Sequence, residues 1–385
     1  MMIRQARAAL RMHFISLLGL GLSAAALLAP GGVRAEPYLA MRSGAKCVAC
    51  HVNPTGGGKR NEFGAIYGQT ALPRERLDPS SGASTPAGAA PAQPWSGQLG
   101  DHFALGGDLR ATAQGEKIPG ADSTTAFDRS RAQLYVEVKA IKDRLTFYVD
   151  EQIAPGAANN RESYAMLWFA NRSAYVKAGR IFIPFGLRIE DDTAFIRQVP
   201  GVSFKSSDDG VEGGLELGPW SASVSVTNGE GGAAETNRGK LISTLASYVR
   251  SDWRVGLSAS SNFHGAADQR MQSVFAGLRA GLFSGLASVV FVTDEATPIG
   301  RLRQRAALVE GNLEIARGQN FKLSYEYHDP DVKVREDQRV RLSAVWEFVP
   351  FQFTQFRLGA RKSDGIPQNR ALHKSELFAQ WHAFF

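Results

Sequence analysis

Cysteine is almost absent from this chain: its 385 residues include only two, Cys47 and Cys50. A scaffold held together by several disulfides is therefore excluded. One bridge between the two would close a very short loop and would restrain little of a long chain. A thioredoxin-like redox pair needs a βαβ context, and the sequence shows no alternation of helical and strand patterns. The pair of thiols needs another explanation.

Acidic residues are absent from positions 1–13, which carry three arginines. The apolar run after them, FISLLGLGLSAAALLAP, is shorter than the ~20 apolar residues that a membrane-spanning helix needs. Small residues ending at Ala35 come next. This order predicts a secretory signal peptide over residues 1–35 rather than a membrane anchor. The mature chain is expected to begin near Glu36, outside the cytoplasm.

His51 directly follows Cys50 and completes the pattern C-x-x-C-H, the signature of covalent haem c attachment. The thiolates of Cys47 and Cys50 add to the two vinyl groups of the macrocycle, and the adjacent imidazole becomes the proximal iron ligand. Export agrees with this chemistry, because bacteria attach haem c outside the cytoplasm. We therefore predict one haem c bound by these three residues. The sixth ligand is left open, with Met41 and His102 as candidates.

Composition divides the mature chain into three parts. Residues 36–78 carry the haem motif and are too few to build a conventional core, but a haem would supply both a core and a crosslink. Residues 79–96 are rich in Pro, Ala, Ser and Gly, which predicts a flexible linker. Residues 97–385 alternate apolar and polar side chains at period two, and clusters of Gly, Asn, Asp and Pro separate the segments.

The period-two region allows two architectures. A soluble β-sandwich would turn its apolar face inward and usually ends well short of ~290 residues. A transmembrane barrel would turn that face outward to lipid and line its lumen with charge. In RAQLYVEVKA, for example, Leu134, Val136 and Val138 share one face, and the opposite face carries Glu137 and Lys139. The heavy charge on the polar face favours the barrel.

The ends of the segments and of the chain also favour a barrel. Aromatic residues gather near segment ends, as they do in the interfacial girdles of outer-membrane proteins. The last segment, ELFAQWHAFF, alternates up to the terminal Phe385 and resembles the assembly signal of bacterial outer-membrane proteins. At ~10 residues per strand plus connections, the region predicts an all-β, up-and-down antiparallel barrel of about 16 strands in the outer membrane.

Two stretches resemble known families. YLAMRSGAKCVACHVNPTGGGKRNEFGAIYG is similar to the haem segment of the fused monohaem cytochrome–porins of the bacterial outer membrane, some of which are linked to iron(II) oxidation. Its piece NPTGGGKRN departs from the typical linker of the best-known iron oxidases. YVKAGRIFIPFGLRIEDDTAFIRQ, residues 175–198, resembles the G-R-x-x-x-P-F-G strand and loop of the phosphate-selective porins.

The resemblance implies an outer-membrane electron carrier, and an iron(II)-oxidising oxidoreductase is one form of it. The haem segment would fold back into the lumen, where Lys46, Lys59 and Arg60 would pair with the haem propionates or the lumen wall, or form a solvated basic face. Electrons would pass between an extracellular donor or acceptor and a periplasmic c-type cytochrome or other carrier. The alternatives are an anion-selective porin plugged by the haem segment and a soluble periplasmic β-protein.

Other partners are expected from the same pattern. Outer-membrane lipid should surround the barrel. No nucleic-acid partner is expected, because the net charge of +7 comes from Lys and Arg spread along the chain and partly from the signal peptide. The oligomeric state is left open, a porin-like trimer being one arrangement that this architecture allows.

Overall fold

The computed structural model describes residues 37–77, 94–204, 206–235, 238–263, 268–298 and 300–385. The predicted signal peptide and most of the predicted linker lie outside these residues. Within them, helices α2 (Pro37–Ser43) and α3 (Glu62–Thr70) and the 3₁₀ turn η1 (Cys47–Ala49) precede the strands. A further helix, α4 (Phe195–Gln198), and a 3₁₀ turn, η2 (Arg370–Leu372), lie between strands. No helix of the described residues is long and apolar enough to cross a membrane.

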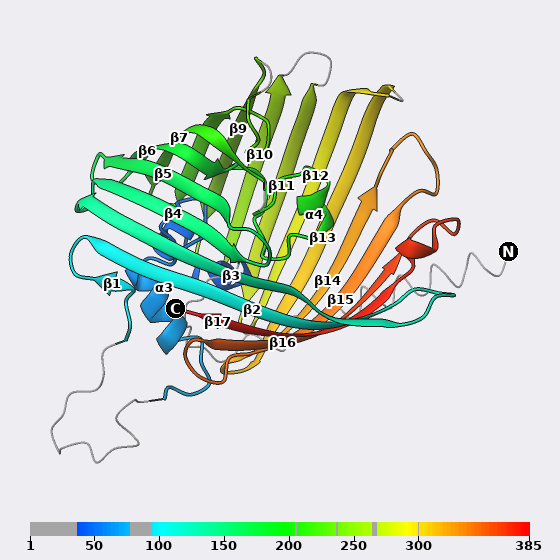
Figure 1. The fold of residues 1–385 in the computed structure, drawn as a ribbon, viewed down its shortest axis with the longest axis horizontal. Helices are drawn as coiled ribbons and strands as arrows, with labels where there is room; N and C mark the ends of the chain where they lie inside the picture. Colours follow the sequence, from blue (N-terminus) through cyan, green and yellow to red (C-terminus); the bar gives the residue numbers. More distant parts are fainter. Residues whose placement is uncertain (1–36, 78–93, 205, 236–237, 264–267, 299) are drawn as a thin grey trace.

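Sixteen consecutive antiparallel strands, β2 to β17, form the wall, and β17 pairs with β2 to close it (Figure 1). A two-residue strand, β1, adds to the edge of β2. This architecture confirms the predicted barrel of about 16 strands. The strands are β1 (Gln98–Leu99), β2 (Phe103–Lys117), β3 (Thr124–Ile141), β4 (Leu145–Ala154), β5 (Asn159–Phe169), β6 (Ala174–Phe182), β7 (Ser207–Leu217), β8 (Trp220–Thr227), β9 (Lys240–Val249), β10 (Trp253–Phe263), β11 (Gln269–Ala280), β12 (Phe283–Thr297), β13 (Gly300–Ala316), β14 (Gln319–Asp329), β15 (Arg339–Phe348), β16 (Thr354–Asp364) and β17 (Ser375–Phe384).

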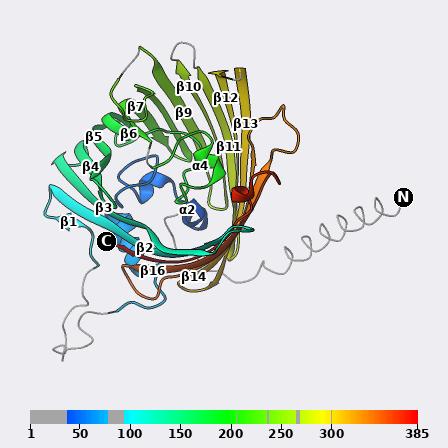
Figure 2. The same ribbon diagram turned by 45° about the vertical axis from the view of Figure 1, so that its right-hand side comes forward.

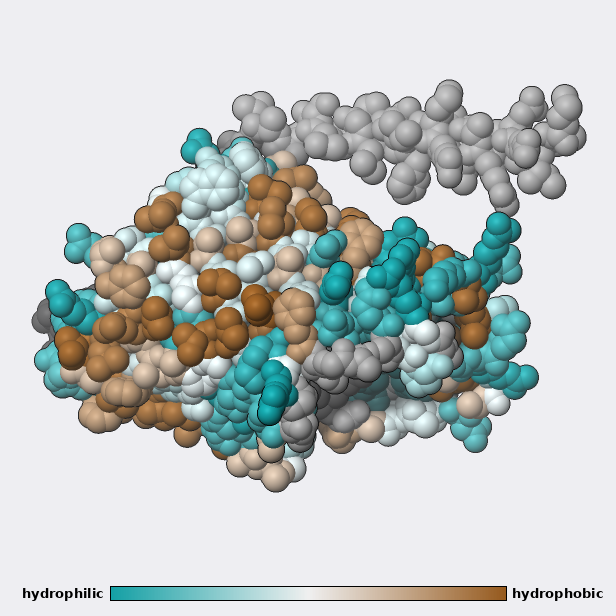
Figure 3. Space-filling model, turned by 90° about the horizontal axis from the view of Figure 1, so that it is seen from above, coloured by the Kyte–Doolittle hydropathy of each residue, from teal (hydrophilic) through white to brown (hydrophobic). Residues whose placement is uncertain are grey.

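The alternation along each strand has the polarity of a membrane barrel. In β10, the side chains of Val255 and Leu257 are 41% and 60% exposed, whereas those of Arg254 and Ser258 are 6% and 3% exposed. Apolar side chains therefore point outward and polar ones into the lumen, the reverse of a soluble sandwich. Figure 3 shows one face of the molecule, on which apolar side chains gather over part of the surface and hydrophilic ones over the rest. The protein is an outer-membrane barrel.

The connections differ at the two ends of the barrel. Residues 281–282 and 317–318 each join neighbouring strands directly, whereas residues 183–206 and 365–374 are longer connections at the opposite end. In outer-membrane barrels the short turns face the periplasm. Gly318 adopts φ +76° in one of these turns, and a Cβ there would lie 2.6 Å from the backbone nitrogen of Arg74. The N-terminal segment therefore leaves the lumen at the periplasmic end.

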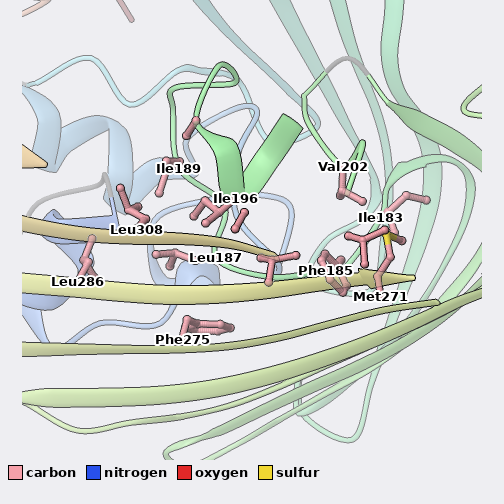
Figure 4. Packing of buried hydrophobic residues seen from close by; sticks show 14 of the residues in the cluster. Ile183, Phe185, Leu187, Ile189, Ile196, Val202, Met271, Phe275, Leu286 and Leu308 are labelled. Carbon is pink, nitrogen blue, oxygen red and sulfur yellow. The ribbon is translucent and has the colours of Figure 1, made fainter. Parts of the chain in front are cut away.

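The described part of the long connection between β6 and β7, residues 183–204 and 206, folds into the lumen instead of extending outward. Figure 2 shows α4, which belongs to it, inside the ring of strands together with α2. Its apolar side chains pack on inward-facing residues of β11, β12 and β13, in the cluster drawn in Figure 4. Tyr38, Leu39 and Met41 of α2 belong to the same cluster. The lumen is thus filled by protein on this side.

Residues 37–77, which we call the plug, also contact the opposite side of the lumen. Val52 of the plug belongs to one buried cluster with inward-facing aromatic side chains of the wall, including Tyr148, Tyr164 and Trp168. Where the plug leaves the lumen, the backbone nitrogen of Arg74 donates a hydrogen bond to the carbonyl oxygen of Val349 at 2.8 Å. Apolar and aromatic residues on the inner face therefore mark where the plug contacts the wall, an exception to the expectation of a charged lumen.

Candidate functional site

The cysteines and the histidine of the predicted haem motif form one tight turn of the plug. The backbone nitrogens of Cys50 and His51 donate to the carbonyl of Cys47 at 3.1 and 3.0 Å. His51 then forms an antiparallel bridge with Arg60. The intervening loop therefore returns the chain to the turn, and α3 begins two residues later. The two thiols are not joined in a disulfide.

Three glycines of the plug let this turn pack closely. A Cβ on Gly56, whose φ is +87°, would lie 3.2 Å from the sulfur of Cys47, and one on Gly64 would lie 2.2 Å from the carbonyl oxygen of Cys50. A Cβ on Gly57 would lie 2.6 Å from the ring of Phe204 on the inward loop. The first glycine of GGGK therefore allows close packing on Cys47, and the second allows close packing on the inward loop.

The turn faces a cavity inside the lumen. Cys47, Cys50 and His51 all line it, together with residues of the inward loop and of the wall. Its volume is about 230 Å³, below the ≈ 300–1,000 Å³ typical of ligand pockets. A large flat prosthetic group would therefore need neighbouring side chains or part of the plug to move.

Basic side chains outnumber acidic ones around the cavity. Among the described residues, seven Lys or Arg side chains line it against three acidic ones, Asp108, Glu190 and Glu216. The basic ones are Lys46, Arg60, Arg110, Arg131, Arg161, Arg188 and Arg254. The excess of four positive charges, seven minus three, favours anionic groups in the cavity.

The three basic residues of the haem segment singled out from the sequence mostly bind the wall. Lys46 pairs with Glu216 at 2.6 Å, and Lys59, which is 1% exposed, pairs with Glu137 at 3.1 Å. Burial lowers the pKa of Lys59, and Glu137 opposes this effect. Arg60 lies over the ring of Phe384 at 4.5 Å. Lumen-wall pairing, one of the alternatives that the sequence left open, thus describes both lysines.

The inward loop carries three consecutive acids that pair with arginines of the wall. The pairs are Glu190 with Arg110 and Arg357, Asp191 with Arg341 and Arg361, and Asp192 with Arg131. Burial alone would raise the pKa of Asp191, but Arg361 and Arg341 hold it below its usual range. The loop therefore stays attached across the lumen at neutral pH and neutralises part of the basic wall.

A buried polar network holds the plug on the opposite side. The amide of Asn53 donates to Glu162 at 2.8 and 3.0 Å, and its oxygen accepts from Lys177 at 3.3 Å. Lys177 also pairs with Glu212 at 3.2 Å. All four side chains are fully buried. This one plug amide thus joins Glu162 and Lys177, two wall residues that lie 109 and 124 positions further along the chain.

The structure brings neither candidate sixth ligand to this cavity. The sulfur of Met41 lies against the barrel wall, 2.6 Å from the position that a Cβ on Gly277 would occupy. His102 is exposed beside β2, with its Nδ1 2.8 Å from the carbonyl oxygen of Lys139. Neither residue lines the cavity with His51, so the assignment of a sixth ligand stays a prediction.

Sequence reasoning missed a histidine that does line the cavity, His382 of β17. Its Nδ1 lies 3.0 Å from the amide oxygen of Gln355, and its Nε2 contacts Asp108. The alternation of the last strand indicated that this histidine faces inward, because His382 falls between Trp381 and Ala383, which share the outward apolar face. The alternation alone does not say that this inward position lies on the same cavity as His51.

The residues present are compatible with a covalently bound haem. Two thiols and an imidazole from one turn face one cavity, and an excess of basic side chains surrounds it. In c-type attachment the thiols bind the macrocycle and the imidazole ligates iron, so Cys47, Cys50 and His51 are the residues that would hold it. Among the described residues, no cluster of three or more His, Cys, Asp or Glu has the geometry to hold a bare metal ion.

Without haem, the Cys50 thiol is expected to be unreactive in the folded protein. Burial, with a contribution from Cys47, raises its pKa from 9.0 to about 11. The thiolate is the nucleophile, and two pKa units lower its fraction at pH 8 about a hundredfold. In a Cys47→Ser variant purified without haem, burial, the larger cause of the shift, remains and the contribution of Cys47 is lost. We therefore expect iodoacetamide to label Cys50 at least about tenfold more slowly than in the same chain unfolded in guanidinium. Equal rates would show that the turn is not packed.

Comparisons with known proteins identify the barrel. No protein-family model matches the chain, and no curated protein matches it by sequence. Among solved structures, a loop L8 deletion mutant of OmpT from Vibrio cholerae is 13% identical, with a TM-score of 0.58 over 74% of this chain and 100% of that one. The barrel has the porin fold.

Two further solved structures give the same result. The anion-selective porin from Comamonas acidovorans is 12% identical, with a TM-score of 0.55 over 74% of this chain and 99% of that one. OprB from Pseudomonas putida is 11% identical, with a TM-score of 0.56 over 74% of this chain and 95% of that one. At these identities the likeness concerns the fold alone.

Proposed function

We propose that this porin-like barrel holds one haem c in its lumen and transfers electrons across the outer membrane. Electrons would pass between an extracellular donor or acceptor, with iron(II) as a candidate donor, and a periplasmic c-type cytochrome or other carrier. The observation that carries the proposal is the position of the Cys47–His51 turn, which faces a cavity inside the barrel. A haem bound there would supply one-electron redox chemistry within an insulating wall.

Each part of the chain has a role in this proposal. Cys47 and Cys50 hold the macrocycle, and His51 ligates the iron. The pairs of Lys46 with Glu216 and of Lys59 with Glu137 fix the plug to the wall, which keeps the site at one depth in the membrane. Because Cys50 is buried in the folded plug, attachment would take place before the plug packs into the barrel.

The test begins with expression of the full chain alongside haem-maturation machinery. We expect one haem per chain that survives denaturing gel electrophoresis, and we expect it to be lost in a Cys47→Ser/Cys50→Ser variant. In liposomes, the haem-bearing protein should pass electrons from an external reductant to a trapped acceptor, and the variant should not. Equal rates for the two proteins, or a wild-type chain without covalent haem, would overturn the proposal.

A second candidate function is an anion-selective channel, in which the haem segment acts as a plug or sensor. The excess of basic side chains around the cavity favours it, and the porin fold is shared with a protein named an anion-selective porin. Taken without the haem motif, the similarity to porins supports this candidate better than electron transfer. Recordings in planar bilayers distinguish the two. Large steady anion currents through the full chain would favour the channel, and a closed lumen would favour the electron carrier.

A further inference from the structure

Asn61, which lies ten residues after His51, contacts the backbone carbonyls of the haem-binding turn. Its backbone nitrogen donates to the carbonyl of Cys50 at 3.0 Å. Its side-chain Nδ2 lies 3.1 Å from the carbonyl oxygens of both Val48 and Ala49, and 3.5 Å from that of His51. The carbonyl of Cys47 is already used within the turn. One residue therefore contacts four consecutive carbonyls.

The other end of the same side chain fixes Asn61 in place. Its Oδ1 accepts a hydrogen bond from the backbone nitrogen of Gly64 at 2.9 Å, as the N-cap of α3. The helix in turn packs on the turn, because a Cβ on Gly64 would lie 2.2 Å from the carbonyl oxygen of Cys50. The cap thus aims the amide nitrogen back at the residues that precede the imidazole.

We propose that Asn61 is a positioning residue that holds the Cys47–His51 turn, and through it the His51 imidazole, in the orientation that ligates haem iron. This proposal rests on the proposed function. Groups that orient a metal ligand commonly change metal affinity by 10- to 100-fold when they are removed. Capping α3 is a separate role of the same side chain, and the experiment must separate the two.

The Asn61→Ser substitution makes this separation. A serine hydroxyl can still cap the helix, but it has no amide to reach the carbonyls of Val48, Ala49 and His51. The readout is the pH at which acid displaces the histidine from the iron, followed in the absorption spectrum of the haem. Because protons and iron compete for the imidazole, a roughly tenfold weaker bond raises this midpoint by about one pH unit.

Asn369→Ser is the matched control. Asn369 also caps a helical turn, with its Oδ1 accepting from the backbone nitrogen of Ala371 at 3.1 Å, but it lies in the connection between β16 and β17. We expect its acid midpoint to equal that of the wild type. Asn61→Asp, which keeps the shape and the cap oxygen, replaces Asn61→Ser if the latter does not give a heat-modifiable folded barrel.

The outcomes distinguish this inference from the proposed function. A raised midpoint in the Asn61 variant alone supports the positioning role. Covalent haem in all variants with identical midpoints overturns that role and leaves the proposed function intact. A wild-type chain that carries no covalent haem overturns both.

Discussion

Deletion of the plug, residues 37–77, is expected to raise the single-channel conductance of the barrel about tenfold or more, since barrels of 16–18 strands leave an aqueous channel when nothing fills them. The plug fills the lumen through its apolar cluster with β11–β13 and through its contacts with β3–β6. The inward loop 183–206 remains after the deletion and still narrows the pore. Lys46 and Arg60 leave with the plug, so five arginines and three acids of the wall and the inward loop remain around the cavity. The opened channel is therefore expected to keep only a weak preference for anions, which a reversal potential in a salt gradient measures.

The matched control for the deletion is the full chain with Cys47→Ser and Cys50→Ser, which keeps the plug and removes covalent haem attachment. Its conductance is expected to stay as low as that of the wild type. A deletion variant that conducts no better than this control would show that the inward loop, held by its acid–arginine pairs, closes the lumen without the plug.

Lys177→Met is expected to lower the free energy of unfolding by about 3–5 kcal/mol, the usual result of removing one partner of a buried ion pair. Lys177 is fully buried, 3.2 Å from Glu212 and 3.3 Å from the amide oxygen of Asn53. Its loss leaves the buried carboxylate of Glu212 without its paired cation and removes a positive charge that attracts the buried carboxylate of Glu162. Urea unfolding of the refolded barrel, followed by tryptophan fluorescence and by heat-modifiable gel mobility, measures the change.

Lys240→Met provides the control, because Lys240 makes an exposed pair with Glu235 at 2.7 Å, for which a change below about 1 kcal/mol is expected. A triple variant that also carries Glu162→Gln and Glu212→Gln should recover most of the lost stability, since the uncompensated charges are then gone. Identical unfolding midpoints for Lys177→Met and Lys240→Met would contradict the role assigned to the buried network.

The alternation of side chains predicted the wall of this protein well. In β3, for example, Leu134 is 41% exposed, whereas Tyr135 and Glu137 are 4% and 6% exposed, as the period of two requires. The number of strands followed from the length of the region divided by the span of one strand and its connection. The haem motif was visible because its chemistry requires two thiols and an imidazole within five positions, which is a local constraint.

The candidate site was less accessible from the sequence. Alternation places His382, Arg254 and Lys177 on the inner face but does not say which part of the plug each contacts. Tyr38 donates to Glu347 at 2.6 Å across 309 positions of sequence, and no local pattern marks such a pair. The resemblance over residues 175–198 indicated only a strand and a loop, and the inward fold of that loop depends on apolar residues that pack against strands far along the chain.

The sequence by itself determined the two-residue alternation of the wall and about how many strands the region can form, and it contains the C-x-x-C-H pattern on which the proposed haem attachment rests. These properties are local, because they depend on the two-residue period of a strand and on neighbouring side chains of one turn. Only the tertiary structure decided that the turn lies inside the lumen and which wall residues surround it. Closure of the ring by β17 and β2 fixes the positions of the strands relative to one another, and contacts across the lumen exist only once that closure is made.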